Sequence, residues 1–366
     1  MTDATTPVIL SAVRTPIGKY LGGLSGFTAP QLGAMVIRDA VARAQVDPAA
    51  VEEVIMGQVI QGGSGQAPAR QALIHAGLPA VIPALTINKV CGSGLKAVML
   101  ASQAIKAGNQ TMVDGMIHDG LWDSFGCCHM GEYAEYTAEK AGVSRQDQDQ
   151  FAYQSHMKAV EATQAGKFKA EILPVQIPGK GGPTTVAADE APRKDTSPDT
   201  LAKLKPAFRK DGGTVTPGNA PGLNDGSSAL VVASLAFAKA HGLTPMAKVT
   251  GYATGGGEPR EIFFAPVQAV RNLMGRTGAT IKDYDLIEAN EAFAVQALAD
   301  GRELGWDWDR VNVHGGAVAL GHPIGASGAR VLTTLLYALR DRNASTGLAT
   351  LCLGGGNAVA LSVELL

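Results

Sequence analysis

The sequence predicts an α/β protein in which helices cover a mostly parallel sheet, and three observations support this. Of the 366 residues, 46% are hydrophobic and only 5% are aromatic, which predicts a core of Ala, Val, Leu and Ile. Short apolar runs of strand length alternate with longer runs of helical periodicity. The second half of the chain also repeats the order of these runs in the first half. A chain of this length suits about two domains.

The first half alternates strand and helix signals. Residues 7–13 form a buried-strand run that closes at Arg14-Thr15-Pro16. The same pattern predicts further strands over residues 54–59 and 84–88, and helices over residues 32–44 and 67–76. Parallel sheets bind their ligands beyond the carboxyl ends of the strands, so this edge is where a site is expected.

Cys91 lies at such an edge. Residues 89–96, Lys-Val-Cys-Gly-Ser-Gly-Leu-Lys, turn from a strand into an apolar helix that continues to Lys106. The free N–H groups and the positive dipole end of a helix N-terminus favour a thiolate, and the glycines let a substrate approach the sulfur. A lone cysteine is more often a buried structural residue, so Cys91 alone does not define a site.

The second half replays this order. Residues 285–290 take the place of residues 54–59, and residues 311–313 take that of the strand before Cys91. A glycine-rich turn over residues 321–328 then leads into a helix over residues 329–339, as the Cys91 turn leads into its own helix. Two packed α/β halves would bring both of these turns to a common cleft.

The repeat is broken at one junction. After its helix, the second half continues with two strands within residues 347–363, joined through Cys352 and a triple glycine. The first half has only residues 111–116 at this point, which are too few and too polar for a central strand. Either the first half lacks this strand, or residues are missing from the sequence near Gln110. The second explanation is favoured, because an open central sheet edge is destabilising.

Residues 117 to about 222 lie outside the repeat and are predicted to form an insertion. A helix over residues 144–166 begins with the capping-box pattern Ser144-Arg145-Gln146-Asp147. The Pro/Gly-rich stretch that follows collects basic residues, among them Arg193, which acidic residues offset. A solvated charged face is the usual role of such a stretch.

Composition excludes several classes of partner. The formal net charge of −2 does not favour nucleic acid or an anionic membrane. The four cysteines match neither a disulfide framework nor metal-ligand spacing, which predicts a reducing, cytoplasmic location and no metal site. Neither a signal-peptide pattern at the start nor an apolar window of about 20 residues is found, so no membrane association is expected.

Groups capable of covalent catalysis occur at Cys91, Asn290-Glu291, His322 and Cys352. Each has an ordinary alternative role, as a core histidine, a cysteine that fills a strand, or a helix cap. The repeat, however, places all of them in loops that follow strands. A thiol nucleophile, a histidine that activates it and a second cysteine acting as acid or base form a complete set for covalent catalysis.

The motifs around these groups resemble the active-site signatures of the thiolases, over nearly the whole chain. They are Lys-Val-Cys-Gly-Ser-Gly at residues 89–94, Asn-Glu-Ala-Phe-Ala at 290–294, Gly-His-Pro-Ile-Gly-Ala-Ser-Gly at 321–328 and Cys-Leu-Gly-Gly-Gly at 352–356. Residues 14–19, 118–123 and 129–131 are most similar to the bacterial acetyl-CoA acetyltransferases, the biosynthetic branch. About thirty residues are missing relative to the family after the Cys91 helix, far more than one strand needs.

This resemblance implies a five-layered αβαβα fold with two duplicated halves and an inserted loop domain. It places an N-terminal thiolase domain at residues 1–112 and 223–243, a coenzyme A (CoA) binding loop domain at residues 113–222, and a C-terminal thiolase domain at residues 244–366. The family usually assembles as a homotetramer, a dimer of dimers.

The resemblance also implies a reaction, the reversible Claisen condensation of two acetyl-CoA to acetoacetyl-CoA and CoA without a tightly bound cofactor. Cys91 would accept the acetyl group, with His322 activating its thiol, and Cys352 would deprotonate the second acetyl-CoA. The N–H groups of Cys91 and Gly354 would form one oxyanion hole, while His322 and a water on Asn290 would bind the enolate oxygen. A broader 3-ketoacyl-CoA thiolase and a non-catalytic acyl-CoA-binding variant are the alternatives.

CoA binding is likewise implied by the resemblance. Arg193 would meet the nucleotide end of CoA, and His129 and Met130 would border the pantetheine and acyl end. Pro221 replaces a serine that contacts the pantetheine in the family, so that hydroxyl contact is lost. Cys127-Cys128 stands before His129 where an aromatic residue is common, which predicts an altered acyl pocket.

Overall fold

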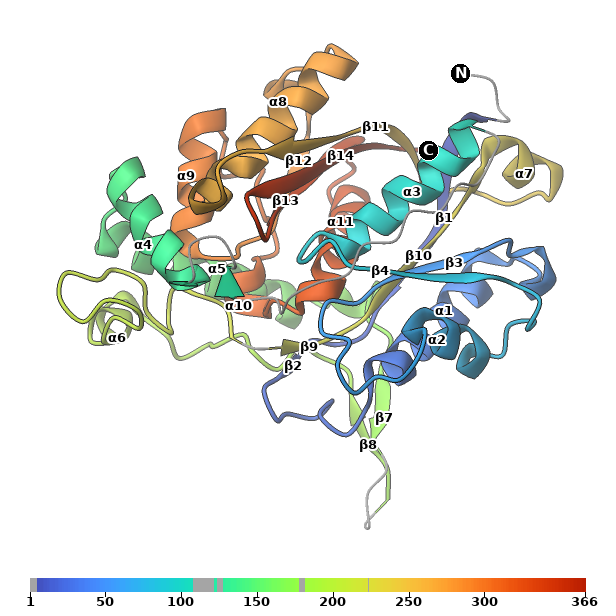
Figure 1. The fold of residues 1–366 in the computed structure, drawn as a ribbon, viewed down its shortest axis with the longest axis horizontal. Coiled ribbons are helices and arrows are strands. Elements are labelled where there is room, and N and C mark those ends of the chain that lie inside the picture. Colours follow the sequence, from blue (N-terminus) through green and yellow to red (C-terminus); the bar gives the residue numbers. More distant parts are fainter. Residues whose placement is uncertain (1–4, 108–121, 124–127, 178–181, 223) are drawn as a thin grey trace.

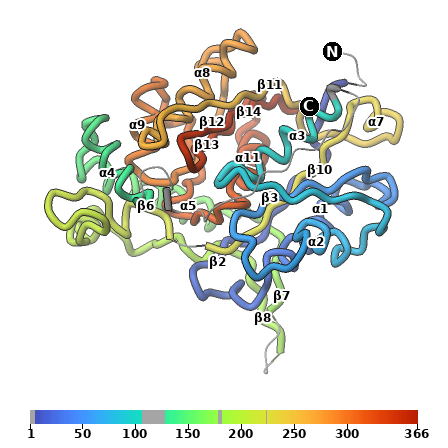
Figure 2. Tube along the Cα trace, in the orientation of Figure 1, coloured from blue at the N-terminus to red at the C-terminus, as the bar shows by residue number. Residues whose placement is uncertain are grey.

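The protein folds into α and β layers (Figure 1), as seen in a computed structural model that describes residues 5–107, 122–123, 128–177, 182–222 and 224–366. The predictions above also concern residues 111–116 and Cys127, which lie outside these ranges. Figure 2 traces the same chain from its blue N-terminal half to its red C-terminal half.

The C-terminal half contains a continuous sheet in the order β11, β14, β13, β12. Its strands are β11 (Ala247–Gly256), β12 (Leu286–Ala289), β13 (Thr346–Leu353) and β14 (Asn357–Leu365). β12 and β13 are parallel, whereas β14 is antiparallel to both β13 and β11. Residues 311–313 form only an isolated bridge from Val311 to Ile287 rather than the predicted strand.

The N-terminal half has the same strand order with one position open. Its strands are β1 (Pro7–Arg14), β3 (Val54–Gly57), β4 (Ala84–Ile87) and β10 (Ser228–Ser234). β4 and β3 form a parallel pair, and β10 and β1 form an antiparallel pair, in agreement with the repeat. Within the described residues, no strand joins β3 to β10, the place that β13 fills between β12 and β14. β1 pairs with β11 at Val8 and Ile9, which joins the two halves.

Helices separate and cover the two sets of strands (Figure 1). α1 (Ala29–Ala44) and α2 (Pro68–Ala76) pack on the outer face of the N-terminal strands, and α8 (Ala265–Thr277), with α9 (Ala294–Leu304) beside it, covers the C-terminal sheet. α3 (Ser93–Ala107) and α11 (Ile324–Asp341) form the middle layer. The predicted αβαβα arrangement of five layers is therefore confirmed. The prediction of a mostly parallel sheet is wrong, because four of the five pairings in the order β10, β1, β11, β14, β13, β12 are antiparallel.

The two middle helices approach each other through glycines near their N-termini. A Cβ atom at Gly94 would lie 2.7 Å from the Ala329 nitrogen, and one at Gly328 would lie 2.4 Å from the Leu95 nitrogen. Real Cβ contacts are never this short, so only glycine permits the crossing. Leu95 and Leu335 belong to the core cluster that surrounds this crossing. The crossing brings the starts of α3 and α11 together, as the repeat predicts.

The remaining elements lie mainly in the predicted insertion. Its helix α5 (Arg145–Gln164) begins with the expected capping box, in which Ser144 and Asp147 exchange side-chain and backbone hydrogen bonds. The other helices are α4 (Met130–Ala141), α6 (Pro198–Ala202), α7 (Leu235–Ala240) and α10 (Ala317–Leu320). Short strands are β2 (Gly18–Lys19), β5 (Trp122–Asp123), β6 (Cys128–His129), β7 (Val175–Ile177), β8 (Thr184–Val186) and β9 (Asn224–Asp225).

Candidate active site

Cys91 lies in a tight turn between β4 and α3. Val90 has a φ of 45°, a left-handed conformation that is rare for a β-branched residue. Its N–H donates to Oδ1 of Asn88 at 2.9 Å, and its carbonyl accepts from Oγ of Ser93 at 2.6 Å. Ser93 Oγ also accepts from the Lys89 N–H at 2.9 Å. These bonds hold the strained turn that presents Cys91, and such strain is typical of functional sites.

The hairpin after β13 interlocks with this turn. A Cβ atom at Gly92 would lie 2.0 Å from Cδ2 of Leu353, and one at Gly354 would lie 3.1 Å from Cγ2 of Val90. The structure thus brings Cys91 and Gly354 into one site from opposite halves of the chain. Cys352 lies within β13, paired with Ala358, and not in a loop as the repeat suggested. The turn of this hairpin starts only at Gly354.

His322 is fixed in one tautomer by its neighbours. Its Nδ1 lies 2.6 Å from Oγ of Ser327, and that hydroxyl donates to the Pro323 carbonyl at 3.0 Å. Because the hydroxyl proton is used in this way, the network assigns the imidazole proton to Nδ1. The lone pair of Nε2 then accepts a long hydrogen bond from Nδ2 of Asn290 at 3.5 Å.

Asn290 follows β12 and is fully buried. Its backbone N–H donates to the Thr350 carbonyl at 3.0 Å, which ties it to β13. Its side-chain Oδ1 has no hydrogen-bond partner within the described part of the chain, although it is buried. A buried unpaired oxygen is costly, so this atom is suited to accept a hydrogen bond from a water or a substrate.

Burial sets the protonation states of the site. It raises the pKa of Cys91 to about 12, against the smaller lowering effect of a backbone hydrogen bond. Burial thus favours the thiol form of Cys91, in opposition to the thiolate that a helix N-terminus favours. Burial, and next Arg330, lowers the pKa of His322 to about 4, so its imidazole is neutral at pH 7.

Cys352 is also a protonated thiol at neutral pH. Its pKa is raised well above 9.0 by burial, and further by the negative charges that Cys91 and Asp300 can carry. Leu353, the residue after Cys352, packs against Gly92, the residue after Cys91. Two thiols and one neutral imidazole are thus gathered in a mostly dry site, with a base available for only one of the thiols.

The insertion contributes His129 and Met130 to the surroundings. Met130 is buried in the same apolar cluster as Cys352 and Phe293. His129 caps α4, with Nδ1 accepting from the Gly131 N–H at 3.0 Å, and its ring stacks on Phe208 at 4.8 Å between centroids. Its Nε2 consequently carries the proton, and burial lowers its pKa. Met130 thus packs in the apolar cluster of Cys352, and His129 lies beside it in the chain.

Pro221 and Arg193 are placed differently. Pro221 is half-buried, and its neighbour Ala220 packs against the cluster that holds Cys352. Arg193 is exposed, and its backbone N–H donates to Nδ1 of His156 at 3.2 Å. Among the described residues, no contact connects Arg193 with Cys91 or His322.

Sequence reasoning missed Ser327 and Asn224, which orient His322. Asn224 Oδ1 accepts from the backbone N–H of His322 at 2.9 Å across 98 residues of sequence. Ser327 lies one helical turn after Pro323, and its spacing of five from His322 was the only available signal. No group of His, Cys, Asp and Glu suited to a metal ion occurs in the described ranges. The helices within those ranges are all too short or too polar to cross a membrane.

Fold and site together define a thiolase, and family comparison agrees. The model for "Thiolase, N-terminal domain" matches residues 7–113 and 106–236, and the model for "Thiolase, C-terminal domain" matches residues 243–365. The chain belongs to the thiolase family.

Three similar proteins illustrate the family match, and each is named acetyl-CoA acetyltransferase. The chain is 51% identical to that of Pseudomonas aeruginosa, over 97% of this chain and 98% of the relative. It is also 51% identical to that of Cupriavidus necator, over the full length of both. The crystal structure of the Bacillus anthracis acetyl-CoA acetyltransferase superposes with a TM-score of 0.94 at 39% identity, covering 99% of each chain.

The family match is interrupted at the junction where the repeat breaks. The two pieces of the N-terminal match meet and overlap at residues 106–113, at the end of α3. The alignment with the Cupriavidus necator relative spans 395 positions, whereas this chain has 366 residues. The relative therefore has residues that this chain lacks.

Proposed function

We propose that the protein is an acetyl-CoA acetyltransferase, which condenses two acetyl-CoA reversibly to acetoacetyl-CoA and CoA through an acetyl group on Cys91. The convergence of the Cys91 turn with the hairpin of Cys352 and Gly354, beside the His322–Asn290 pair, is the observation that supports this most strongly. The names of relatives at 51% identity support the same activity.

In the first half-reaction, Nε2 of His322 takes the Cys91 proton as the sulfur attacks the thioester carbonyl. A base is needed because the thiol pKa is about 12 in the free site. Departing CoA thiolate takes the proton of Cys352, whose thiol is protonated at neutral pH. Acetyl-Cys91, free CoA, imidazolium and the Cys352 thiolate result, with every proton accounted for.

In the second half-reaction, the Cys352 thiolate removes a proton from the methyl group of another acetyl-CoA. The enolate oxygen accepts from His322 Nε2–H and from a water held by Oδ1 of Asn290. The carbanion attacks acetyl-Cys91, and the released Cys91 sulfur regains its proton from His322. N–H groups of Cys91 and Gly354 stabilise the tetrahedral intermediates as an oxyanion hole. Both cysteines are thiols again at the end, so the cycle can repeat.

CoA is a substrate in this scheme, and no tightly bound cofactor takes part. We assign its binding to the insertion, with residues 113–222 as loop domain between the N-terminal domain (1–112 and 223–243) and the C-terminal domain (244–366). His129, Met130 and Pro221 border the acyl and pantetheine end, supported by the packing of Met130 beside Cys352. Arg193 meets the nucleotide end, for which its exposure leaves the guanidinium available.

The assembly and location follow from the family resemblance. We assign a homotetramer, a dimer of dimers, in the cytoplasm, without nucleic acid or membrane partners. Light scattering after size exclusion tests the tetramer, and a monomer in solution would contradict it.

The activity is tested by following free CoA and acetoacetyl-CoA formed from acetyl-CoA alone. The proposal expects both products in equal amounts. It also expects faster thiolysis of the four-carbon 3-ketoacyl-CoA than of longer ones, because the relatives at 51% identity are named acetyl-CoA acetyltransferase. A preference for long chains would instead identify a broader 3-ketoacyl-CoA thiolase.

One observation favours a second candidate, a non-catalytic acyl-CoA-binding protein. In the part of the chain that the structure describes, no strand fills the position between β3 and β10 in the half that carries Cys91. Tight binding of acetyl-CoA without any release of CoA would support this candidate and contradict the first.

A further inference from the structure

Asn312 continues the hydrogen-bond ladder of β12 with its side chain. Its backbone N–H donates to the Ile287 carbonyl at 3.0 Å, as in a pair of strands, but its φ of 45° then bends the chain away. The side-chain amide has the donor and acceptor of a peptide group and pairs with Ala289 in its place. Oδ1 accepts from the Ala289 N–H at 2.9 Å, and Nδ2 donates to the Ala289 carbonyl at 2.8 Å. This explains why residues 311–313 form a bridge instead of the predicted strand.

Glu291, on the other side of Asn290 in the chain, binds the same side chain. Nδ2 of Asn312 donates to Oε1 of Glu291 at 2.8 Å. Oε2 of Glu291 accepts from Oγ of Ser155 at 2.8 Å and from the Val318 N–H at 3.0 Å. The side chains of Asn312, Glu291 and Ser155 are all buried, and together they are called the Asn312 clamp. The clamp therefore binds both chain neighbours of Asn290.

The loop after Asn312 packs closely against the clamp. A Cβ atom at Gly316 would lie 2.2 Å from Cδ of Glu291, so only glycine permits this approach. The Gly316 N–H also donates to Oγ of Ser155 at 3.0 Å. Ser155 belongs to α5 of the insertion. The clamp thus joins the end of β12, the loop after Asn312 and the insertion.

Asn290 itself is held mainly through its backbone. Within the described part of the chain, its side chain makes one long hydrogen bond, 3.5 Å between Nδ2 and Nε2 of His322, and its Oδ1 has no partner. Its backbone N–H donates to the Thr350 carbonyl at 3.0 Å. The position of the Asn290 carboxamide is therefore set by its backbone, which β13 and the Asn312 clamp hold in place.

We propose that Asn312, acting with Glu291 and Ser155, is a positioning residue for Asn290 and serves the condensation half-reaction. The inference rests on the proposed function, in which the Asn290 carboxamide holds the water that binds the enolate oxygen. Acetylation of Cys91 needs no such water. A displacement of about 1 Å in a catalytic group can slow a reaction about 100-fold. Loss of the clamp should therefore slow condensation and leave acetylation nearly unchanged.

The test compares the two half-reactions in Asn312→Gly. Glycine adopts a φ of 45° without strain, so the bend is kept while the side-chain amide is lost. Acetoacetyl-CoA formation should fall at least about tenfold, whereas stopped-flow acetylation of Cys91 should stay within about threefold of wild type. Asn343→Gly is the matched control, because Asn343 is exposed and has a φ of 52°, and both of its rates should be unchanged. Equal slowing of both half-reactions in Asn312→Gly, or unchanged condensation, would overturn the proposal.

A double-mutant cycle tests whether Asn312 acts through Asn290. Asn290→Ala removes the group that the clamp positions, so adding Asn312→Gly to it should slow condensation by no more than about twofold. A further tenfold loss in the double variant would show that Asn312 acts elsewhere and would contradict the proposal.

Glu291→Gln tests the clamp without changing Asn312. The single amide oxygen of glutamine is needed by the Ser155 and Val318 donors, which leaves an NH₂ group against Nδ2 of Asn312. Condensation should slow about fivefold, the equivalent of one hydrogen bond, and acetylation should persist. Circular dichroism checks the folding of each variant. Loss of neither half-reaction, or of both equally, would count against the clamp.

The wild-type chain separates this inference from the proposed function. Absence of acetyl-enzyme in the wild-type chain would refute the proposed function. Normal acetylation, with wild-type condensation in Asn312→Gly and Glu291→Gln, would refute only the role of the clamp.

Discussion

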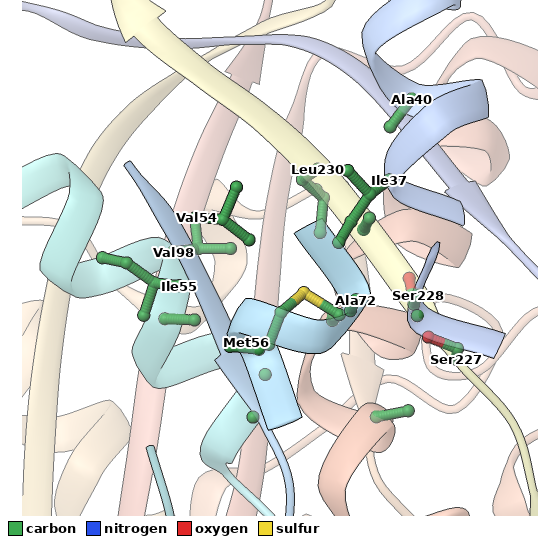
Figure 3. A pocket seen from close by; sticks show the side chains of 18 of the residues that line it. Ile37, Ala40, Val54, Ile55, Met56, Ala72, Val98, Ser227, Ser228 and Leu230 are labelled. Carbon is green, nitrogen blue, oxygen red and sulfur yellow. The ribbon is translucent and has the colours of Figure 1, made fainter. Parts of the chain in front are cut away.

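The two halves of the molecule have the same strand order but differ in completeness. β13 lies between β12 and β14 in the C-terminal sheet. Within the described residues, no strand lies between β3 and β10, where Ile55, Met56 and Leu230 line a cavity (Figure 3). Cys91 belongs to the open half, and His322, Asn290 and Cys352 belong to the closed one. The residues proposed as acid, base and enolate-binding groups therefore lie in the half with the continuous sheet, while the proposed nucleophile depends on its own turn and on contacts with that half.

Loss of Cys352 should have the largest effect. Cys352→Ala removes the proton donor and acceptor of the closed half, and condensation should fall about 10³-fold, within the range of general acid–base catalysis. Acetylation of Cys91 should persist. Rates of acetoacetyl-CoA formation and of acetyl-enzyme formation check this. Cys128→Ala, in the same apolar cluster, is the control and should retain condensation.

Packing in the two halves should differ in its contribution to stability. Leu361 of β14 is fully buried, so Leu361→Ala should lower the free energy of unfolding by about 3 kcal/mol. Leu230 of β10 lines the cavity between β3 and β10 and is only half-buried. Leu230→Ala should therefore lower the free energy of unfolding by about 1 kcal/mol. Urea unfolding measures both. Equal losses of unfolding free energy would show that the cavity between β3 and β10 is not open in solution.

Acid should destabilise the fold through buried neutral histidines. Burial lowers the pKa of both His322 and His156 to about 4. The unfolded chain takes up these protons near pH 6.5, so stability is full above pH 6.5 and falls between there and pH 4. The slope should be about 1.4 kcal/mol per pH unit for each histidine.

Denaturant unfolding at several pH values measures this slope. His322→Gln should reduce it, whereas His75→Gln, at an exposed position, should not. An unchanged slope in His322→Gln would show that this imidazole is not held neutral by the fold.

The smallest effect is expected for the residue that orients His322. Ser327→Ala removes the acceptor of the Nδ1 proton, and acetylation of Cys91 should slow about tenfold, the equivalent of one hydrogen bond. Ser102→Ala is matched to it, since Ser102 is buried in α3 and bonds only to the Val98 carbonyl. Stopped-flow acetylation rates compare the two variants. Equally slow acetylation in both variants would show that Ser327 contributes by packing and does not orient His322.

Much of this comparison could be predicted from the sequence. The repeat located the Cys91 turn, the glycine-rich turn of His322 and the junction near Gln110 where the repeat breaks, because apolar periodicity and glycine spacing are local signals. It also predicted that the starts of α3 and α11 meet, which Gly94 and Gly328 make possible.

Other features depend on contacts that no local pattern encodes. Ser327 and Asn224 act on His322 through hydrogen bonds of a specific geometry. The pKa of Cys91 depends on a helix N-terminus, which can be read from sequence, and on desolvation, which comes from the assembled site. The extension of the cavity between β3 and β10 to His322 likewise appears only when both halves are packed together.

The most direct test of the account is the site of acetylation. The protein is incubated with acetyl-CoA, quenched in acid, digested and analysed by mass spectrometry. The account predicts one acetyl group per chain, on the peptide that contains Cys91, and none in Cys91→Ala. An acetyl group on Cys352 instead, or no acetyl-enzyme at all, would contradict the claim that the open half supplies the nucleophile.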